Sequence, residues 1–214
     1  MPPPSACLIT LEGGEGAGKS TQAGRLAAAL SATGLAVVTT REPGGAPGAE
    51  EIRVLLVDGD SGRWDPLSEA LLHFAARREH LRQTILPALE RGSWVISDRF
   101  ADSTMAYQGS GLRLDRKIIE FLYDCVAGDL QPDLTIILDL PVEEGLARAS
   151  ARAGGGMRYE GMGLDFHRRL REGFLDIARR EPARCAVVDA ARNVDQVGED
   201  ILAAVRERLG PQGL

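Results

Sequence analysis

Short apolar runs alternate with longer segments of helical periodicity along most of the chain, and this alternation limits the fold more than any other feature. Five runs rich in β-branched residues are expected to be strands: Leu8–Leu11, Ala36–Thr39, Trp94–Ser97, Leu134–Leu138 and Ala186–Val188. The helical segments are Lys19–Ala32, Pro66–Arg91, Arg116–Ala127, Asp165–Arg180 and Val194–Leu209. Continuously apolar strands are typical of a sheet covered on both faces, and strands that alternate with helices are typical of parallel pairing. We therefore predict an α/β fold with a five-stranded parallel sheet flanked by helices.

The length and continuity of the chain indicate a single domain. The 214 residues are enough for one good-sized domain, and no linker, internal repeat or low-complexity tract divides residues 1–214. The one flexible interruption is Gly154–Gly156. Residues 1–6 are expected to form a short flexible tail and not a signal peptide, because they have no basic flank and no long apolar segment.

The composition argues against membrane and nucleic-acid partners. No apolar run approaches the roughly 20 residues that cross a bilayer. The net charge of −6 lacks the basic excess that general nucleic-acid binding needs. Cys7, Cys125 and Cys185 each lie in an apolar segment without metal-ligand spacing. We expect buried thiols and a cytoplasmic protein.

The segment Gly13–Ser20, GGEGAGKS, lies between the first predicted strand and the first predicted helix. It fits G-x-x-x-x-G-K-[ST], the pattern of the P-loop that binds nucleotide phosphates. Without Cβ atoms the main chain can wrap a phosphate and direct N–H groups at its oxygens, and the helix dipole adds to this attraction. Lys19 is then expected to bridge the β- and γ-phosphates and Ser20 to bind Mg²⁺. The alternative is a glycine-rich turn without a ligand.

Polar residues also follow the second and third predicted strands. Asp98 and Arg99 come directly after the run Trp94–Ser97, and the segment Thr39–Gly45 continues the second run. Because the carboxyl ends of parallel strands face the ligand crevice, Asp98 could hold Mg²⁺ and Arg99 could bind an acceptor phosphate through two hydrogen bonds. The alternatives are a surface ion pair at Asp98 and Arg99 and an ordinary polar loop at Thr39–Gly45.

Three arginines, Arg148, Arg152 and Arg158, flank the triple glycine. A mobile segment with arginines is what a phosphoryl-transfer enzyme needs to exclude water and neutralise charge. An exposed helix with a frayed end is the alternative.

Six motifs lie between about Leu8 and Ile201: LEGGEGAGKSTQ, TREPGG, EEIR, FAARREHL, SDRFADSTMAYQGSG and PDLTIILDLP. Together they resemble the bacterial thymidylate kinase family, and the combination of DRF with STMAYQG is more specific than the P-loop. The resemblance implies the P-loop nucleoside monophosphate kinase fold, with a small lid at about residues 148–163. It also implies transfer of the γ-phosphate of ATP to dTMP with Mg²⁺, usually by a homodimer.

The resemblance also implies roles for individual residues. It places ATP at Gly13, Gly14, Glu15, Gly16, Ala17, Gly18, Lys19, Ser20 and Thr21. It places the acceptor phosphate at Arg53 and Arg99, with Glu42 lining the same pocket. It places Glu15 near the sugar 3′-hydroxyl and Tyr107 beside C2′, where an aromatic ring excludes a ribose hydroxyl. Arg77, Thr104 and Gln108 are implied as the polar contacts of thymine.

The chain departs from the family pattern at three positions. The family has a base-stacking phenylalanine four residues before the base-reading arginine, where this chain has His73, followed by Phe74. Either the His73 imidazole stacks and Arg77 reads the base, or Phe74 stacks and Arg78 reads it; FAARREHL favours Arg77. The lid has Met157 where the family commonly has an aspartate before Arg158.

The third departure lies in the P-loop. Some family members carry an arginine next to the loop acid, where this chain has Gly16. A lid arginine, Arg152 or Arg158, is then expected to neutralise the transferring phosphoryl group together with Lys19 and Arg99. The acceptor oxygen is already ionised, so catalysis needs positioning and charge neutralisation and no strong general base.

Other P-loop functions are the alternatives to this interpretation. A P-loop kinase could act on another nucleotide or small acceptor, and a P-loop switch or motor would need a residue that positions water, which we do not identify. A nucleotide-binding module without catalysis is disfavoured because Lys19, Ser20 and Asp98 are all present.

Overall fold

The computed structural model describes residues 6–151 and 157–210. In these residues five strands form one sheet: β1 Leu8–Glu12, β2 Val37–Arg41, β3 Trp94–Asp98, β4 Leu134–Asp139 and β5 Cys185–Asp189. The strand order is β2-β3-β1-β4-β5, and every neighbouring pair is parallel. The predicted five-stranded parallel sheet is confirmed, with each strand close to its expected bounds.

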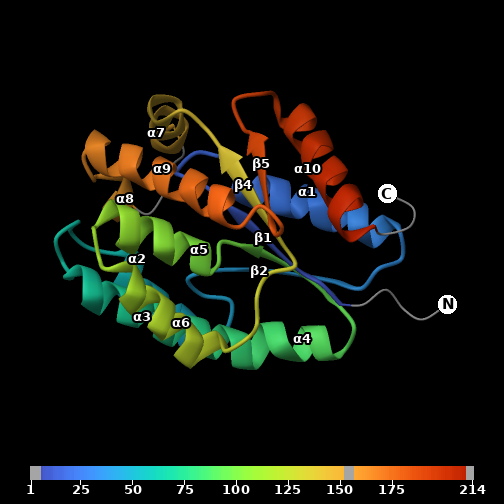
Figure 1. The fold of residues 1–214 in the computed structure, drawn as a ribbon, viewed down its shortest axis with the longest axis horizontal. Coiled ribbons are helices and arrows are strands. Elements are labelled where there is room, and N and C mark those ends of the chain that lie inside the picture. The colour runs from blue at the N-terminus through green and yellow to red at the C-terminus, as the bar shows by residue number, and fades with distance from the viewer. Residues whose placement is uncertain (1–5, 152–156, 211–214) are drawn as a thin grey trace.

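Helices cover both faces of the sheet, as Figure 1 shows. They are α1 Lys19–Ala32, α2 Pro47–Val57, α3 Pro66–His80, η1 Leu81–Ile85, α4 Leu86–Glu90, α5 Ala101–Thr104, η2 Met105–Gly111, α6 Arg116–Ala127, α7 Val142–Ser150, α8 Met157–Glu160, α9 Leu164–Arg180 and α10 Val194–Leu209. The helices predicted from periodicity are present. We did not predict α2, α5, η2, α7 and α8, most of which are too short to show a periodic pattern.

The segment predicted as one helix from Pro66 to Arg91 is continuous but changes geometry in its middle. The π-helical turn η1 joins α3 to α4. Pro87 has no N–H and its ring clashes with the carbonyl four residues earlier, which belongs to Gln83. The wider π turn precedes this proline and relieves the clash. A second π-helical stretch, η2, continues α5 and carries two predicted site residues, Tyr107 and Gln108.

The central strand β1 is buried along its whole length and divides its side chains between two core layers. Ile9 and Leu11 pack in the layer that α1 and α10 complete, and these two helices lie side by side in Figure 1. Leu8 packs on the opposite face against η1 and α4. Burial on both faces explains why the β1 run is continuously apolar.

The register of the sheet brings three strand ends together. Asp98 at the end of β3 pairs with Leu11 of β1 on one side and with Arg41 of β2 on the other. The segments that follow these strands, which begin at Gly13, Glu42 and Arg99, therefore leave the sheet at one edge. This edge is where the sequence predicted the ligand crevice.

The cysteines are only partly as expected. Cys7 and Cys185 are buried, but Cys125 is exposed on α6. It lies one turn after Phe121, which is also exposed, because residues four apart share a face of a helix. None of the helices in the described ranges is long and apolar enough to cross a membrane.

Candidate active site

A cleft of about 240 Å³ opens at this edge of the sheet, between the P-loop and the helices α2, α3 and η2. Its wall contains the predicted site residues Glu15, Gly16, Gly18, Lys19, Ser20, Glu42, Arg53, His73, Arg77, Asp98, Arg99, Thr104, Tyr107 and Gln108. The structure thus brings together residues from five regions of the chain. The other predicted site residues that the structure describes do not line this cleft: Gly13, Gly14, Ala17, Thr21, Phe74 and Arg158.

The P-loop has the backbone geometry of an anion site. Gly13, Gly16 and Gly18 all have positive φ, which residues with a Cβ adopt at a cost. No side chain caps the first turn of α1, so its N–H groups are available to a ligand. Lys19 Nζ donates to the carbonyl oxygens of Gly13 at 3.1 Å and Gly14 at 2.7 Å. The pKa of Lys19 is lowered to about 8, mainly by burial and secondly by the positive charge of Arg99. Nearby carboxylates act in the opposite direction but do not outweigh these two causes.

Close backbone packing explains why this loop has glycine beside its acid. A Cβ on Gly16 would lie 2.0 Å from the Gly145 carbonyl oxygen, and a Cβ on Gly145 would lie 2.5 Å from the Glu15 carbonyl oxygen. The P-loop and α7 therefore touch backbone to backbone. The resemblance implies that some family members carry an arginine next to the loop acid. An arginine at position 16 of this chain does not fit the backbone contact between the P-loop and α7.

Two side chains whose oxygens could bind a metal ion, Ser20 and Asp98, lie together beside the P-loop. The Ser20 hydroxyl donates a hydrogen bond to the Asp98 carboxylate. A hydroxyl and a carboxylate are hard oxygen ligands of the kind that Mg²⁺ prefers, and Mg²⁺ commonly takes its remaining ligands from water and substrate phosphates. The described residues contain no cluster of three or more His, Cys, Asp or Glu that could hold a metal. The pair thus fits a magnesium ion that is bound together with a phosphate.

Arg99 lies at the centre of a network at the floor of the cleft. Its guanidinium donates to the Gly13 carbonyl oxygen at 3.0 Å, to Tyr107 Oη at 2.9 Å and to Glu15 Oε1 at 3.4 Å. Tyr107 Oη in turn donates to Glu15 Oε1 at 2.5 Å. Burial acts to raise the pKa of Glu15, but Arg99, Lys19 and Tyr107 outweigh it and the pKa is lowered. Glu15 is therefore a carboxylate that fixes Arg99 and Tyr107.

Glu12, which the sequence analysis did not single out, supports the Arg99 turn. Arg99 has a φ of 71°, which is uncommon for a residue with a side chain. The next turn is held because Glu12 accepts hydrogen bonds from the Phe100 N–H at 2.7 Å and from Ser103 Oγ at 2.6 Å. Burial, and next the charge of Asp102, raise the pKa of Glu12 to about 8. The only sequence signal was an acid at the end of an otherwise apolar strand.

Glu42 fixes the arginine at the far end of the cleft. Its Oε2 accepts from Arg77 Nε at 2.8 Å, and its Oε1 lies 3.0 Å from His80 Nδ1. Arg77 also donates to Thr104 Oγ1 at 3.1 Å. The third nitrogen, Arg77 Nη1, is buried and has no hydrogen-bond partner in the described part of the chain. Arg77 therefore has one donating nitrogen without a partner among the described residues.

Arg53 comes from α2 and enters the cleft beside the TREPGG segment. Its Nη1 donates to the Pro43 carbonyl oxygen at 2.6 Å. Burial, and next the neighbouring Arg41, lower the pKa of Arg53. Arg41 itself pairs with Glu50 at 3.0 Å. Arg53 thus adds a positive charge to the wall of the cleft.

The structure separates His73 from Phe74. His73 lines the cleft, whereas Phe74 is 2% exposed and lies beneath the Arg77 guanidinium. The distance from Arg77 Cζ to the centroid of the Phe74 ring is 4.8 Å. Burial, and next Arg77, lower the pKa of His73 to about 3, so its ring is neutral at pH 7. Arg78 donates to the Val126 carbonyl oxygen outside the cleft. Of the two predicted pairings, the one with His73 and Arg77 is in the cleft wall.

The lid arginines have different surroundings. Arg158 on α8 is buried, and it donates to Glu69, to the Leu56 carbonyl oxygen at 3.0 Å and to the Asp60 carbonyl oxygen at 3.2 Å. It therefore fastens α8 to α2 and α3, and its donors are not directed at the P-loop. Arg152, predicted as the alternative, lies outside the described residues.

Comparison with known proteins decides the family. A sequence profile described as thymidylate kinase matches residues 11–201. The chain belongs to the thymidylate kinase family. The thymidylate kinase of Caulobacter vibrioides is 56% identical, covering 95% of this chain and 97% of that protein. The thymidylate kinase of Dinoroseobacter shibae is 52% identical, covering 92% and 94%.

A solved structure of the thymidylate kinase family agrees with the fold. The crystal structure of thymidylate kinase from Ehrlichia chaffeensis matches with a TM-score of 0.77 at 37% identity, covering 95% of this chain and 99% of that chain. The P-loop nucleoside monophosphate kinase fold, predicted from the resemblance, is confirmed.

Proposed function

We propose that this chain transfers the γ-phosphate of ATP to dTMP, giving ADP and dTDP for the synthesis of dTTP. One observation carries the proposal: the cleft that contains the P-loop is also lined by Arg77 and Gln108, whose buried atoms Nη1 and Oε1 have no hydrogen-bond partner in the described part of the chain. Thymine offers a carbonyl acceptor next to an N3–H donor, so its edge complements this pair. Family membership supports the same assignment.

The donor ATP is proposed to bind at Gly13, Gly14, Glu15, Gly16, Ala17, Gly18, Lys19, Ser20 and Thr21. Lys19 would hold the β- and γ-phosphates, and Ser20 with Asp98 would hold Mg²⁺ at those phosphates. When bound, Mg²⁺ supplies charge that stabilises the transferring phosphoryl group. The residues of the chain position the two phosphates in line, because the acceptor oxygen is already ionised.

The acceptor dTMP is proposed to lie along the opposite wall. Arg53 and Arg99 would hold its phosphate, with Glu42 keeping Arg77 in place at the base. Glu15 and Tyr107 would contact the sugar, where the Tyr107 ring would exclude a 2′-hydroxyl. Arg77, Thr104 and Gln108 would meet the thymine edge, and the neutral ring of His73, not Phe74, would stack on its face.

The proposed setting follows from charge and composition. A net charge of −6 and the absence of a membrane-spanning helix in the described residues favour small-molecule partners in the cytoplasm over nucleic acid or membrane.

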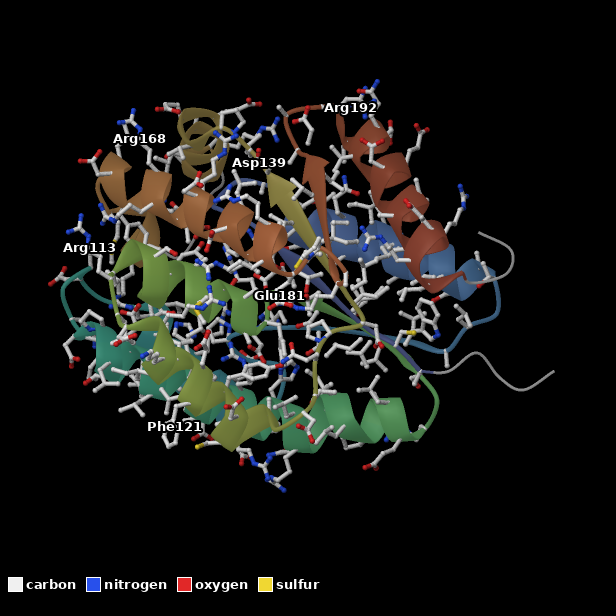
Figure 2. The ribbon with its side chains drawn as sticks, viewed as in Figure 1. Arg113, Phe121, Asp139, Arg168, Glu181 and Arg192 are labelled. Carbon is white, nitrogen blue, oxygen red and sulfur yellow. The ribbon has the colours of Figure 1, made fainter. Side chains whose placement is uncertain are left out.

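We further infer that two copies associate through α2, α3 and α6. These adjacent helices expose large apolar side chains: Val54, Leu55, Leu67, Leu71, Ile118 and Phe121. Phe121 is 65% exposed and lies at the outer face of the protein in Figure 2. Large apolar side chains exposed on neighbouring helices are typical of an interface, and a homodimer with twofold symmetry would bury them.

The activity is tested by a panel of acceptors with ATP and Mg²⁺. We expect rapid ADP formation with dTMP, slower formation with dUMP, and little with dCMP or ribothymidine monophosphate. Chelation of Mg²⁺ should stop the reaction, and its return should restore it. The control is ATP without an acceptor, which separates phosphoryl transfer from hydrolysis. Purified protein that leaves dTMP unchanged, or that prefers another acceptor, contradicts the proposal.

The lowered pKa of Lys19 predicts a pH dependence of ATP binding. Lys19 is charged below its pKa of about 8 and neutral above it, so the affinity of the free protein for ATP should fall above pH 8, by at most about tenfold per pH unit. Calorimetric titration between pH 7 and 9.5 measures this. Lys19→Met should bind ATP weakly at every pH, and its affinity should not fall near pH 8. A fall of equal size in that variant would show that Lys19 is not the cause of the pH dependence.

The two lid arginines should respond differently to substitution. Since Arg158 is tied to Glu69, we propose Arg152 as the arginine that neutralises the transferring group, and Arg152→Ala should lower kcat by on the order of 10²–10³. Arg158→Ala should instead lower thermal stability, because it leaves Glu69 buried without its counter-charge. Steady-state kinetics and thermal melts measure both effects. A near-normal kcat in both variants would show that neither arginine is catalytic.

The association surface is tested by a charge placed in it. Phe121→Glu should convert the dimer to a monomer because each copy would bury a carboxylate in the proposed apolar interface. Val194→Glu is the matched control, since Val194 is exposed at the start of α10 on the other side of the sheet. Sedimentation analysis gives the mass of each. A wild-type protein that sediments as a monomer would refute the inference.

A further inference from the structure

Glu69 on α3 is a buried carboxylate beside the cleft that does not itself line it. Glu69 has no surface exposed to solvent. Glu69 Oε1 accepts hydrogen bonds from Gln108 Nε2 at 2.6 Å and from Tyr159 Oη at 2.7 Å, and its Oε2 accepts from Arg158. A buried carboxylate needs a counter-charge and hydrogen-bond donors, and Arg158 and Tyr159 provide them. The remaining neighbour, Gln108, lies in the cleft wall.

The contact with Glu69 decides which end of the Gln108 amide is free. An ionised carboxylate can only accept hydrogen bonds, whereas an amide has a donating nitrogen and an accepting oxygen. Gln108 must therefore turn Nε2 to Glu69. Its Oε1 is buried and has no hydrogen-bond partner among the described residues. The contact with the Glu69 carboxylate thus leaves Gln108, a residue of the cleft wall, with its accepting oxygen unpaired.

This polarity matters for the choice between pyrimidine bases. Thymine carries a donor at N3 and an acceptor at position 4, whereas cytosine carries an acceptor at N3 and a donor at position 4. Arg77 Nη1 and Gln108 Oε1 match thymine, and a buried mismatch with cytosine leaves both groups unpaired. If the Gln108 amide could turn over, its Nε2 would satisfy the N3 lone pair of cytosine.

We propose that Glu69 is a positioning residue that sets base selection by fixing the orientation of the Gln108 amide. The inference rests on the proposed function, because it takes dTMP as the acceptor. Arg158 and Tyr159 contribute by holding the Glu69 carboxylate in place. Base selection thus depends on Glu69, which does not contact the base itself but orients Gln108, which does.

The test compares dTMP with 5-methyl-dCMP, which keeps the methyl group and sugar and differs only at N3 and position 4. Glu69→Gln can donate or accept, so it no longer dictates the Gln108 orientation. We expect the ratio of kcat/KM for dTMP over 5-methyl-dCMP to fall by about tenfold or more, the value of one buried hydrogen bond. Where turnover of 5-methyl-dCMP is too slow, its inhibition constant against dTMP gives the ratio.

Two controls separate positioning from loss of structure. Glu69→Asp keeps an acceptor-only group and should keep the wild-type ratio. A merely structural role for Glu69 would lower both kcat/KM values together and leave the ratio unchanged, which would overturn the proposal. If Glu69→Gln fails to fold because Arg158 loses its counter-charge, the double variant Glu69→Gln/Arg158→Met removes both charges and should show the same fall in the ratio.

A crystal structure of the wild-type protein with dTMP provides a readout that needs no variant. We expect the Gln108 side chain within hydrogen-bond distance of both N3 and Glu69, and a base whose N3 lies away from Gln108 would overturn the inference. Failure of the proposed function is distinct, since it would appear as wild-type protein that does not phosphorylate dTMP. A wild type that phosphorylates dTMP with an unchanged ratio in Glu69→Gln refutes only the inference about Glu69.

Discussion

Ion pairs between arginines and carboxylates that are partly or fully buried hold the side chains in and behind the cleft wall in place. Arg99 is held by Glu15, Arg77 by Glu42 and Arg158 by Glu69. The exposed fractions of these side chains fall from 16% and 19% in the first pair to 1% and 4% in the second and 0% in the third. Burying such pairs has a desolvation cost that their attraction does not always exceed, so their value lies in fixed geometry. Guanidinium groups already in position need no reorganisation when a phosphate or base arrives.

The sheet places these pairs where they can act together. Glu15 and Glu42 follow β1 and β2, and Arg99 follows β3 between them, so the strand register sets their spacing. Arg77 and Glu69 both come from α3 and lie about two turns apart on that helix, Arg77 in the cleft wall and Glu69 behind it. Because β1 is packed on both faces, the edge from which these residues leave cannot shift without disturbing both core layers.

The sequence predicted the elements whose physical cause is local. Apolar runs predicted β1 to β5, and the P-loop spacing placed Lys19 and Ser20 at the start of α1, as observed. The resemblance predicted most of the cleft wall. The carboxylate partners Glu12 and Glu69 were missed because each acts through a segment at least 39 residues away, which no local pattern reveals. The choice between His73 and Phe74 also needed the structure, because neighbouring residues on a helix point about 100° apart and only the packing of α3 fixes which one faces the cleft.

The hydrogen-bond partners of the acids near the P-loop also affect which acceptor the cleft could phosphorylate. The two acids that line the cleft at the P-loop already have partners: Glu15 binds Arg99 and Tyr107, and Asp98 accepts from Ser20. Glu12, whose pKa is raised, does not line the cleft. A carboxylate whose pKa is lowered, as that of Glu15 is, makes a weak proton acceptor. A hydroxyl acceptor would need a better base than these, whereas a phosphate oxygen ionised at neutral pH needs none. The electrostatics of the cleft thus suit a monophosphate acceptor better than a nucleoside or a sugar, independently of how the base is recognised.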